Sequence, residues 1–328
     1  MFGLGHLQPL HGLVAGSGVL VYLAACVGQY LVDCHGARRR ATLTGLRQAL
    51  FPWTKLLTHS TRIDLIFYGI NRFTHHLSLI TNVALAVLVS HAIASLGGGE
   101  AVSPDLLGLG LAYALAVLPR DLAHYAIHRL FHKSPFLWEL HKVHHASTYL
   151  TPLTTLRTHP IEDQIFALAE GLAMGVALGL LRWRYAFADA DLLIVAPTAY
   201  KAVQALVLVP LQHSHVRLHF GPLNRIFYSP SLHQVHHSAE ALHWDKNFGE
   251  CLSLWDSLFG SYQPLGRDMV TLGLAGEEHL AYRTLRACYG RPLTRQLAMI
   301  RRCLSATWGG EAMTPAAPQT SRSMTDVA

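Results

Sequence analysis

The sequence predicts an all-α fold: a multi-pass membrane bundle of about four or five transmembrane helices, with a cytosolic helical cap that carries clustered histidines. Its composition predicts the membrane, because 51% of the residues are hydrophobic and only 14% are charged, against about 25% charged in a typical soluble domain. Several long runs lack any charge, which predicts the spans. Histidines that recur at three- and four-residue spacing predict the helical cap.

The first predicted span is the uncharged run 12–32, since about 20 apolar residues cross the hydrocarbon core. The arginines at 38–40 follow it, and basic residues favour the cytosolic side. A cleaved signal peptide is the alternative, but the run is long for one and its basic cluster comes after it. Residues 41–76 are mixed and basic, as expected of a cytosolic or interfacial connection. Residues 77–96 form a second uncharged span.

A third apolar run, 104–118, is too short to cross the membrane alone. Its helical period continues through Pro119 into the histidine-bearing segment, which predicts one long helix with a kink at the proline. The apolar runs 165–181 and 192–211 then predict a transmembrane hairpin, which returns the chain to the face that it left. Within this hairpin, Glu170 and Lys201 either form an ion pair, because charges inside spans usually find partners, or extend toward the membrane surface by snorkelling.

These segments predict four regions along the chain. They are an N-terminal transmembrane region at 1–120, a histidine-bearing region at 121–262 that includes the hairpin at about 165–211, a cytosolic segment at 263–308 and a disordered tail at 309–328. The tail is rich in Pro, Ser, Thr and Ala and has little to bury.

Fourteen of the 22 histidines lie between His124 and His243, and their spacing is the strongest signal in the chain. The pattern H-x-x-H-H occurs twice, whereas chance predicts it about 0.1 times in a chain of this composition. Each copy has the spacing of one helix face, as do three earlier histidines at i, i+4 and i+8. The members of these three sets are His124, His128 and His132; His141, His144 and His145; and His233, His236 and His237.

So many imidazoles indicate two metal ions, because one zinc takes only three or four protein ligands. Imidazole suits iron, copper, nickel and zinc, so ligand type leaves the metal open. Neutral ligands favour an oxygen-derived anion on the metals, and nearby carboxylates would then accept hydrogen bonds from the imidazoles. The candidate carboxylates are Asp121, Glu139, Glu162, Asp163 and Asp245. The five cysteines contain no C-x-x-C pair, and the basic residues form no nucleic-acid motif.

Residues 115–262 resemble the fatty acid hydroxylase and sterol desaturase superfamily of integral-membrane diiron oxygenases. HYAIHRLFH, HKVHH and HQVHH are similar to the three histidine boxes, LRTHPIED to the segment after the second box, and LQHSH to the place of a further histidine. NFGECLSLWDSLFGSY is similar to the terminal signature. The resemblance implies nine iron ligands: His128, His132, His141, His144, His145, His213, His233, His236 and His237. Further candidates, for which packing or hydrogen bonding is the alternative role, are His124, His159 and His215.

The resemblance also implies a reaction, in which two irons use O2 and two electrons to hydroxylate, or desaturate, a membrane lipid. The electrons would come from a separate donor, such as a cytochrome b5-like protein or a ferredoxin with its reductase. The site would lie on the cytosolic face of a bacterial inner membrane or the endoplasmic reticulum. Two alternatives remain: a membrane zinc hydrolase, although H-E-x-x-H is absent, and a metal transporter, although its ligands would be expected near the midplane.

Overall fold

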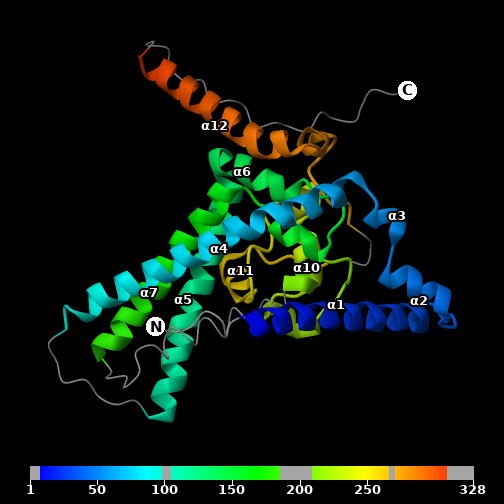
Figure 1. The fold of residues 1–328 in the computed structure, drawn as a ribbon, viewed down its shortest axis with the longest axis horizontal. Coiled ribbons are helices and arrows are strands. Elements are labelled where there is room, and N and C mark those ends of the chain that lie inside the picture. The colour runs from blue at the N-terminus through cyan, green and yellow to red at the C-terminus, as the bar shows by residue number, and fades with distance from the viewer. Residues whose placement is uncertain (1–7, 98–104, 185–208, 266–269, 309–328) are drawn as a thin grey trace.

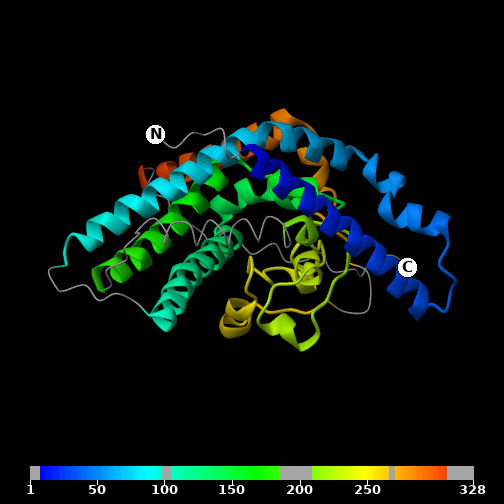
Figure 2. The same ribbon diagram turned by 60° about the horizontal axis from the view of Figure 1, so that its bottom comes forward.

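The computed structural model describes residues 8–97, 105–184, 209–265 and 270–308. The predicted all-α class is confirmed: the described residues form α- and 3-10 helices with two isolated β-bridges and no sheet. Helices α4, α5 and α7 extend toward one side of the molecule, and the long helix α1 lies on the other side, where the short helices and loops gather (Figures 1 and 2). The described elements are, in chain order, α1 (Gln8–Gly36), α2 (Leu43–Leu50), α3 (Trp53–Leu56), α4 (His59–Ala94), α5 (Leu106–Lys133), α6 (Pro135–His145), η2 (Pro152–Leu156), α7 (Pro160–Arg184), α9 (Val209–Gln212), η4 (Gly221–Arg225), α10 (Pro230–His236), η5 (Ala241–His243), α11 (Leu254–Phe259), η6 (Glu278–Tyr282) and α12 (Leu285–Trp308).

Three of the described helices are long and apolar enough to cross a membrane: α1 over Val19–Gly36, α4 over His59–Ala94 and α7 over Pro160–Trp183. They correspond to the predicted spans 12–32, 77–96 and 165–181. Most of the predicted span 192–211 lies outside the described residues, as does Lys201.

Helix α4 begins at His59, so the second half of the expected connection over 41–76 is helical and continuous with the span. Thr58 caps the helix, because its side chain accepts a hydrogen bond from Thr61 N. At 1.5 Å per residue, 36 residues extend about 54 Å, well beyond a core of about 30 Å. The apolar half after Leu77 therefore suffices to span, and the polar first half is available to support the cap.

Three glycines allow α7 to lie close against α4. A Cβ built on Gly171 would lie 2.7 Å from Asn82 O, one on Gly175 would lie 2.9 Å from Ala86 O, and one on Gly179 would lie 2.6 Å from Ile93 Cβ. These glycines repeat at every fourth residue and so share one helix face.

Helix α5 runs unbroken through Pro119, as predicted. It ends at Ser134 because the residue before a proline disfavours helical geometry. Ser134 then caps α6, accepting a hydrogen bond from Leu137 N, and Pro135 occupies the first turn. This break reverses the chain, so that the histidines at the end of α5 face those of α6.

Arg157 ties together segments that are far apart in sequence. Its guanidinium donates to Val143 O of α6 (2.9 Å), to Asp64 of α4 (2.9 Å) and to Tyr282 O of η6 (3.4 Å). The side chain is 1% exposed, and the Asp64 carboxylate is fully buried. A buried charge needs such a set of partners, since an unpaired one is costly. Apolar residues of α4, α6, η6 and α12 cluster around it, including Phe67, Val143, Tyr282 and Cys288.

Candidate metal centre

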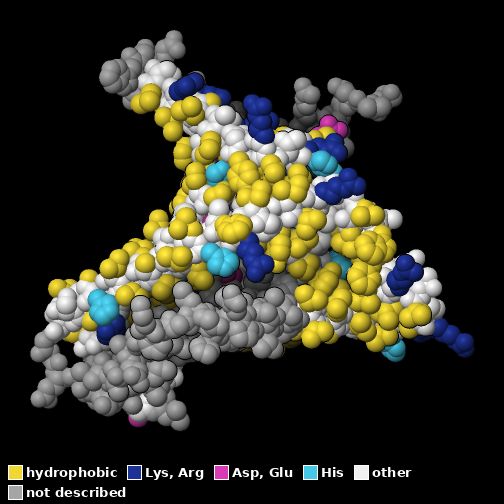
Figure 3. Space-filling model, in the orientation of Figure 1, with side chains coloured by type: hydrophobic (Ala, Val, Ile, Leu, Met, Phe, Trp, Pro, Cys, Tyr) yellow, Lys and Arg dark blue, Asp and Glu magenta, His cyan; other side chains and the backbone are white. Residues whose placement is uncertain are grey.

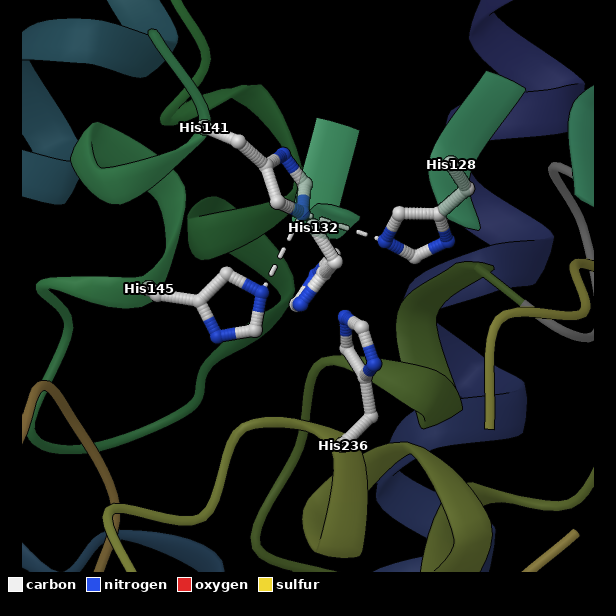
Figure 4. A group of neighbouring side chains, drawn as sticks. All are labelled: His128, His132, His141, His145 and His236. Atoms are coloured by element: carbon white, nitrogen blue, oxygen red, sulfur yellow. Dashed lines mark hydrogen bonds between the residues drawn. The ribbon is translucent and has the colours of Figure 1, made fainter. Parts of the chain in front are cut away.

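Two groups of histidines converge in the interior of the cap. The first holds His128, His132, His141, His145 and His236, and the second holds His144, His213, His233 and His237. Within each group, one ring nitrogen of every member lies within 4.8 Å of the others. Figure 4 shows the five imidazoles of the first group pointing toward one another from α5, α6 and α10.

The H-x-x-H-H boxes are each divided between the two groups. In the box on α6, the i, i+4 pair His141 and His145 joins the first group, while His144 joins the second. In the α10 box the pair His233 and His237 joins the second group, and His236 joins the first. On a helix, i+4 lies about 40° from i on one side and i+3 about 60° on the other. One box can therefore serve two sites, which refines the prediction that each box lines one face.

Hydrogen bonds at Nδ1 fix the protonation of three rings in the first group. His128 donates to Phe248 O (2.9 Å), His141 to Glu162 Oε1 (2.6 Å) and His236 to Lys246 O (2.9 Å). The two carbonyl acceptors lack protons, so Nδ1 of His128 and of His236 carries one, and each of these neutral rings presents a lone pair at Nε2. His141 has the same form when Glu162 is ionised, which a cation at the centre of the group would favour.

Those lone pairs face one another. His128 Nε2 and His141 Nε2 lie 3.1 Å apart, and the His128 ring has no proton left to place between them. His132 Nε2 and His236 Nε2 are buried and make no hydrogen bond among the described residues. Buried nitrogens of this kind need a partner, and a cation at the centre of the group would supply one.

The second group has the same character. His213 Nε2 lies 3.1 Å from His144 Nε2 and 2.8 Å from His233 Nε2, and His237 Nε2 lies 3.0 Å from His233 Nε2. Thr155 Oγ1 contacts the outer nitrogen of His213 at 3.2 Å. The residues present therefore fit two cations, one in each group.

The two groups are in contact. The rings of His145 and His237 stack with their centroids 4.5 Å apart, and those of His141 and His144 stack at 5.4 Å. Metal ions held by the two groups would therefore lie close together in one buried site.

Burial keeps these imidazoles neutral. Desolvation is the largest cause of the lowered pKa values, and it lowers the pKa of His144 to about 3 and that of His236 to about 4. The pKa values of His145, His213, His233 and His237 are also lowered, chiefly by burial. Neutral imidazole is the form that binds metal.

The three further candidates lie outside both groups. His124 bonds to Glu170 at 2.9 Å, and its ring meets His128 edge to face. His159 bonds to Tyr289 O at 3.2 Å. His215 bonds to Ala49 O at 3.2 Å and stacks on Tyr149. In each of these three residues, one ring nitrogen therefore has a hydrogen-bond partner outside the two histidine groups.

Of the carboxylates predicted to support the imidazoles, Glu162 does so directly, through His141. Asp245 lies 3.8 Å from His132 Nδ1, too far for a hydrogen bond, and pairs with Lys133 at 2.5 Å. The others contact different groups: Asp121 accepts from Trp255 Nε1 and Cys251 N, Glu139 from Lys142, and Asp163 faces Thr158.

Backbone carbonyls hold two of the rings, and sequence reasoning missed them. Phe248 is the second residue of the NFG motif, and Lys246 directly precedes the motif. Asp256 of the WD motif accepts hydrogen bonds from Phe248 N (2.8 Å) and Gly249 N (2.9 Å). The NFG and WD signature was the available signal, because a motif that contains no ligand must act by positioning one.

A charged network adjoins the first group between α5 and α7. Glu170 accepts from Arg120 Nη2 at 2.8 Å and from Asn82 Nδ2 at 3.4 Å, besides its contact with His124. Arg120 also pairs with Glu250. Glu170 thus has charged partners among the described residues, and the predicted partner Lys201 lies outside them.

The fold and the paired imidazole groups define a helical membrane protein with a histidine-rich centre suited to two metal ions. Residues 113–261, a little under half of the chain, match the family model described as fatty acid hydroxylase. The resemblance predicted from the histidine boxes is thereby confirmed for this region.

Three relatives illustrate the family. The chain is 31% identical to ornithine lipid hydroxylase OlsE of Rhizobium tropici, over 53% of this chain and 49% of the relative. It is 31% identical to alkylglycerol monooxygenase of Danio rerio, over 49% and 32%, and 24% identical to a very-long-chain aldehyde decarbonylase of Oryza sativa subsp. indica, over 61% and 31%. It thus covers about half or less of the length of each of these relatives. No solved structure gives a significant match.

Proposed function

We propose that the protein is a membrane-bound diiron oxygenase that hydroxylates a lipid with O2 and two electrons. Desaturation is the close alternative outcome, since both reactions begin by removing hydrogen from the same kind of C–H bond. The relatives support the lipid class, because two of the three are named as a lipid hydroxylase and an alkylglycerol monooxygenase.

The observation that carries the proposal is the pair of imidazole groups, five and four in number, in ring contact with each other. Nine neutral nitrogen ligands leave the charge of two dications uncompensated, which favours an anion derived from reduced oxygen. When bound, two irons would supply the activation of O2 and the oxidation of an unactivated C–H bond.

The chain's own residues have distinct tasks in this proposal. The nine imidazoles would bind the two metal ions. Glu162 and the carbonyls of Phe248 and Lys246 would hold protons on Nδ1, so that Nε2 faces the metal. Burial of the rings would exclude water. Electrons would come from a cytochrome b5-like protein or a ferredoxin with its reductase. The lipid would enter sideways from the bilayer, and the centre would face the cytosol.

The test is the metal content and activity of the protein purified in detergent. We expect about two irons per chain, and O2-dependent oxidation of lipid only after a reductase and carrier are added. His144→Ala and His236→Ala should each lower iron content and reduce activity by orders of magnitude. The matched control His279→Ala removes a histidine outside both groups.

Other outcomes would contradict the proposal. Zinc with hydrolytic activity would favour a hydrolase, and metal uptake into vesicles without lipid oxidation would favour a transporter. Full iron and full turnover in both alanine variants would show that the two groups are not halves of one centre.

A further inference from the structure

Helix α12 carries an exposed apolar stripe that the proposed reaction does not use. Leu293, Leu297 and Ile300 are 42%, 46% and 43% exposed. Their spacing of four and then three residues places them within about 60° of one another around the helix. Exposed apolar residues in such a row mark a surface that contacts something apolar.

Contacts on a different face fix how α12 is rotated. Cys288, Pro292 and Gln296 are the buried positions, and Gln296 Nε2 donates to Phe136 O of α6 at 2.9 Å. Arg295 pairs with Glu139 and Glu278, each at 3.4 Å. The buried face lies roughly 100° around the helix from the apolar stripe, so the stripe is not the side by which α12 joins the protein.

The charged residues of α12 are all of one sign. The helix contains five arginines and no acidic residue. Arg291, Arg295 and Arg302 lie about half a turn from the stripe, and Arg301 lies beside it. A helix with one apolar face and an arginine-rich polar face is typical of a segment that lies in the plane of a membrane and favours anionic lipids.

The placement of α12 suits that role. It extends away from α6 and diverges from α4 and α7 (Figure 1). In Figure 3, hydrophobic side chains line its lower edge, on the side of the long helices, and Lys or Arg atoms line its upper edge. The apolar side thus faces in the direction of the bilayer that those helices cross.

We propose that α12 is an interfacial helix, which lies on the cytosolic membrane surface with Leu293, Leu297 and Ile300 among the lipids and the exposed Arg301 and Arg302 near anionic headgroups. It would hold the cap at the bilayer surface. The inference rests on the membrane fold and is independent of the metal chemistry.

The experiment places a fluorescent label at single cysteines in the full chain, reconstituted in nanodiscs that contain a nitroxide-labelled phosphatidylcholine. Leu297→Cys and Ile300→Cys test the stripe, and Ser305→Cys, an exposed polar position of the same helix, is the matched control. All are made with Cys303→Ser, because the other four cysteines are buried. We expect the lipid nitroxide to quench the two stripe labels several-fold more strongly than the control label.

A second comparison tests the charge. Adding phosphatidylglycerol should strengthen quenching at position 300, and Arg301→Glu with Arg302→Glu should remove that gain. Equal and weak quenching at all three positions would overturn the proposal. So would crosslinking between copies through Ile300→Cys that excludes lipid, because the stripe would then be an interface between chains. Iron content and lipid oxidation should be unchanged in the labelled variants, which separates this test from that of the proposed function.

Discussion

A single carboxylate orients His141 within the first histidine group. Glu162 is 2% exposed, and its Oε1 lies 2.6 Å from His141 Nδ1. By holding the proton on Nδ1, it turns the Nε2 lone pair toward the centre and raises the basicity of the ring.

Replacing Glu162 should therefore weaken metal binding without removing a ligand. Glu162→Ala is expected to lower metal affinity about 10- to 100-fold, while Glu162→Gln, which keeps an acceptor oxygen, should lose less. Chelator competition followed by metal analysis measures this, with the exposed Glu277→Ala as the control. Metal affinity that is unchanged in Glu162→Ala would show that the hydrogen bond has no part in binding.

The lowered pKa values of the buried histidines predict a pH dependence for the metal-free protein. In the unfolded chain a histidine titrates near 6.5, whereas the pKa of His236 is about 4 and that of His144 about 3 in the folded state. The unfolded state thus binds more protons below about pH 6.5. Each such histidine should cost about 1.4 kcal/mol of stability per pH unit as the pH falls from 6.5 toward its folded pKa.

Thermal unfolding of chelator-treated protein between about pH 8 and pH 5 measures this loss. Buried carboxyls such as Asp256, whose pKa burial raises, act in the opposite direction, so the histidine effect is the difference between this curve and that of a variant with His144→Phe and His236→Phe. The variant should lose less stability than the unchanged protein as the pH falls below about 6.5. Equal losses in the two proteins would contradict the effect.

Among the elements, those carrying the histidines were the most predictable from sequence. The unbroken α5 followed from its helical period, and the Ser134–Pro135 break separates two boxes that the spacing had already placed on helices. The division of each box between two groups could not be predicted, because the i+3 and i+4 positions are compatible with one site or two. Tertiary contacts decide which ring joins which group.

The start of α4 was missed for a different physical reason. Hydropathy identifies the apolar half after Leu77, but the first half is helical through buried polar contacts. Asn71 donates to Leu156 O (2.8 Å) and Thr158 O (2.7 Å), and Asp64 receives Arg157. Such long-range partners leave no local pattern in the sequence.

Close contact between α4 and α7 predicts opposite effects for two glycine substitutions. Gly175→Ala places a methyl group 2.9 Å from Ala86 O and should destabilise the protein by about 1–3 kcal/mol through overpacking. Gly69→Ala, on α4 with nothing within 4 Å, should instead stabilise it by up to about 1 kcal/mol, the usual gain in a helix interior. Unfolding in detergent distinguishes them, and equal effects would show that the helices do not depend on the glycine contact.

At the scale of the whole molecule, the apolar helices predict how the chain sits in the membrane. We expect the protein to be extracted only with detergent, with an odd number of spans and a cytosolic C-terminus, because Arg38–Arg40 follow the first span. Reporter fusions after residue 328 measure the side, and a fusion within 97–104, in the connection after α4, serves as the opposite-side control. A C-terminal reporter outside the cytosol would overturn this topology.

The contacts of Arg157 with α4, α6 and η6 have a consequence for folding during synthesis. All nine histidines of the two groups have been synthesised once His237 is added, but Arg157 beside the α6 box also needs Tyr282, 45 residues later, and α12 follows that. Domains generally fold as units during synthesis. The nascent chain would therefore contain imidazoles that can bind metal before the fold holds them in two groups. We therefore expect the two metal ions to bind selectively only after the chain has been released. Chains truncated shortly after residue 237 should bind metal ions with little selectivity.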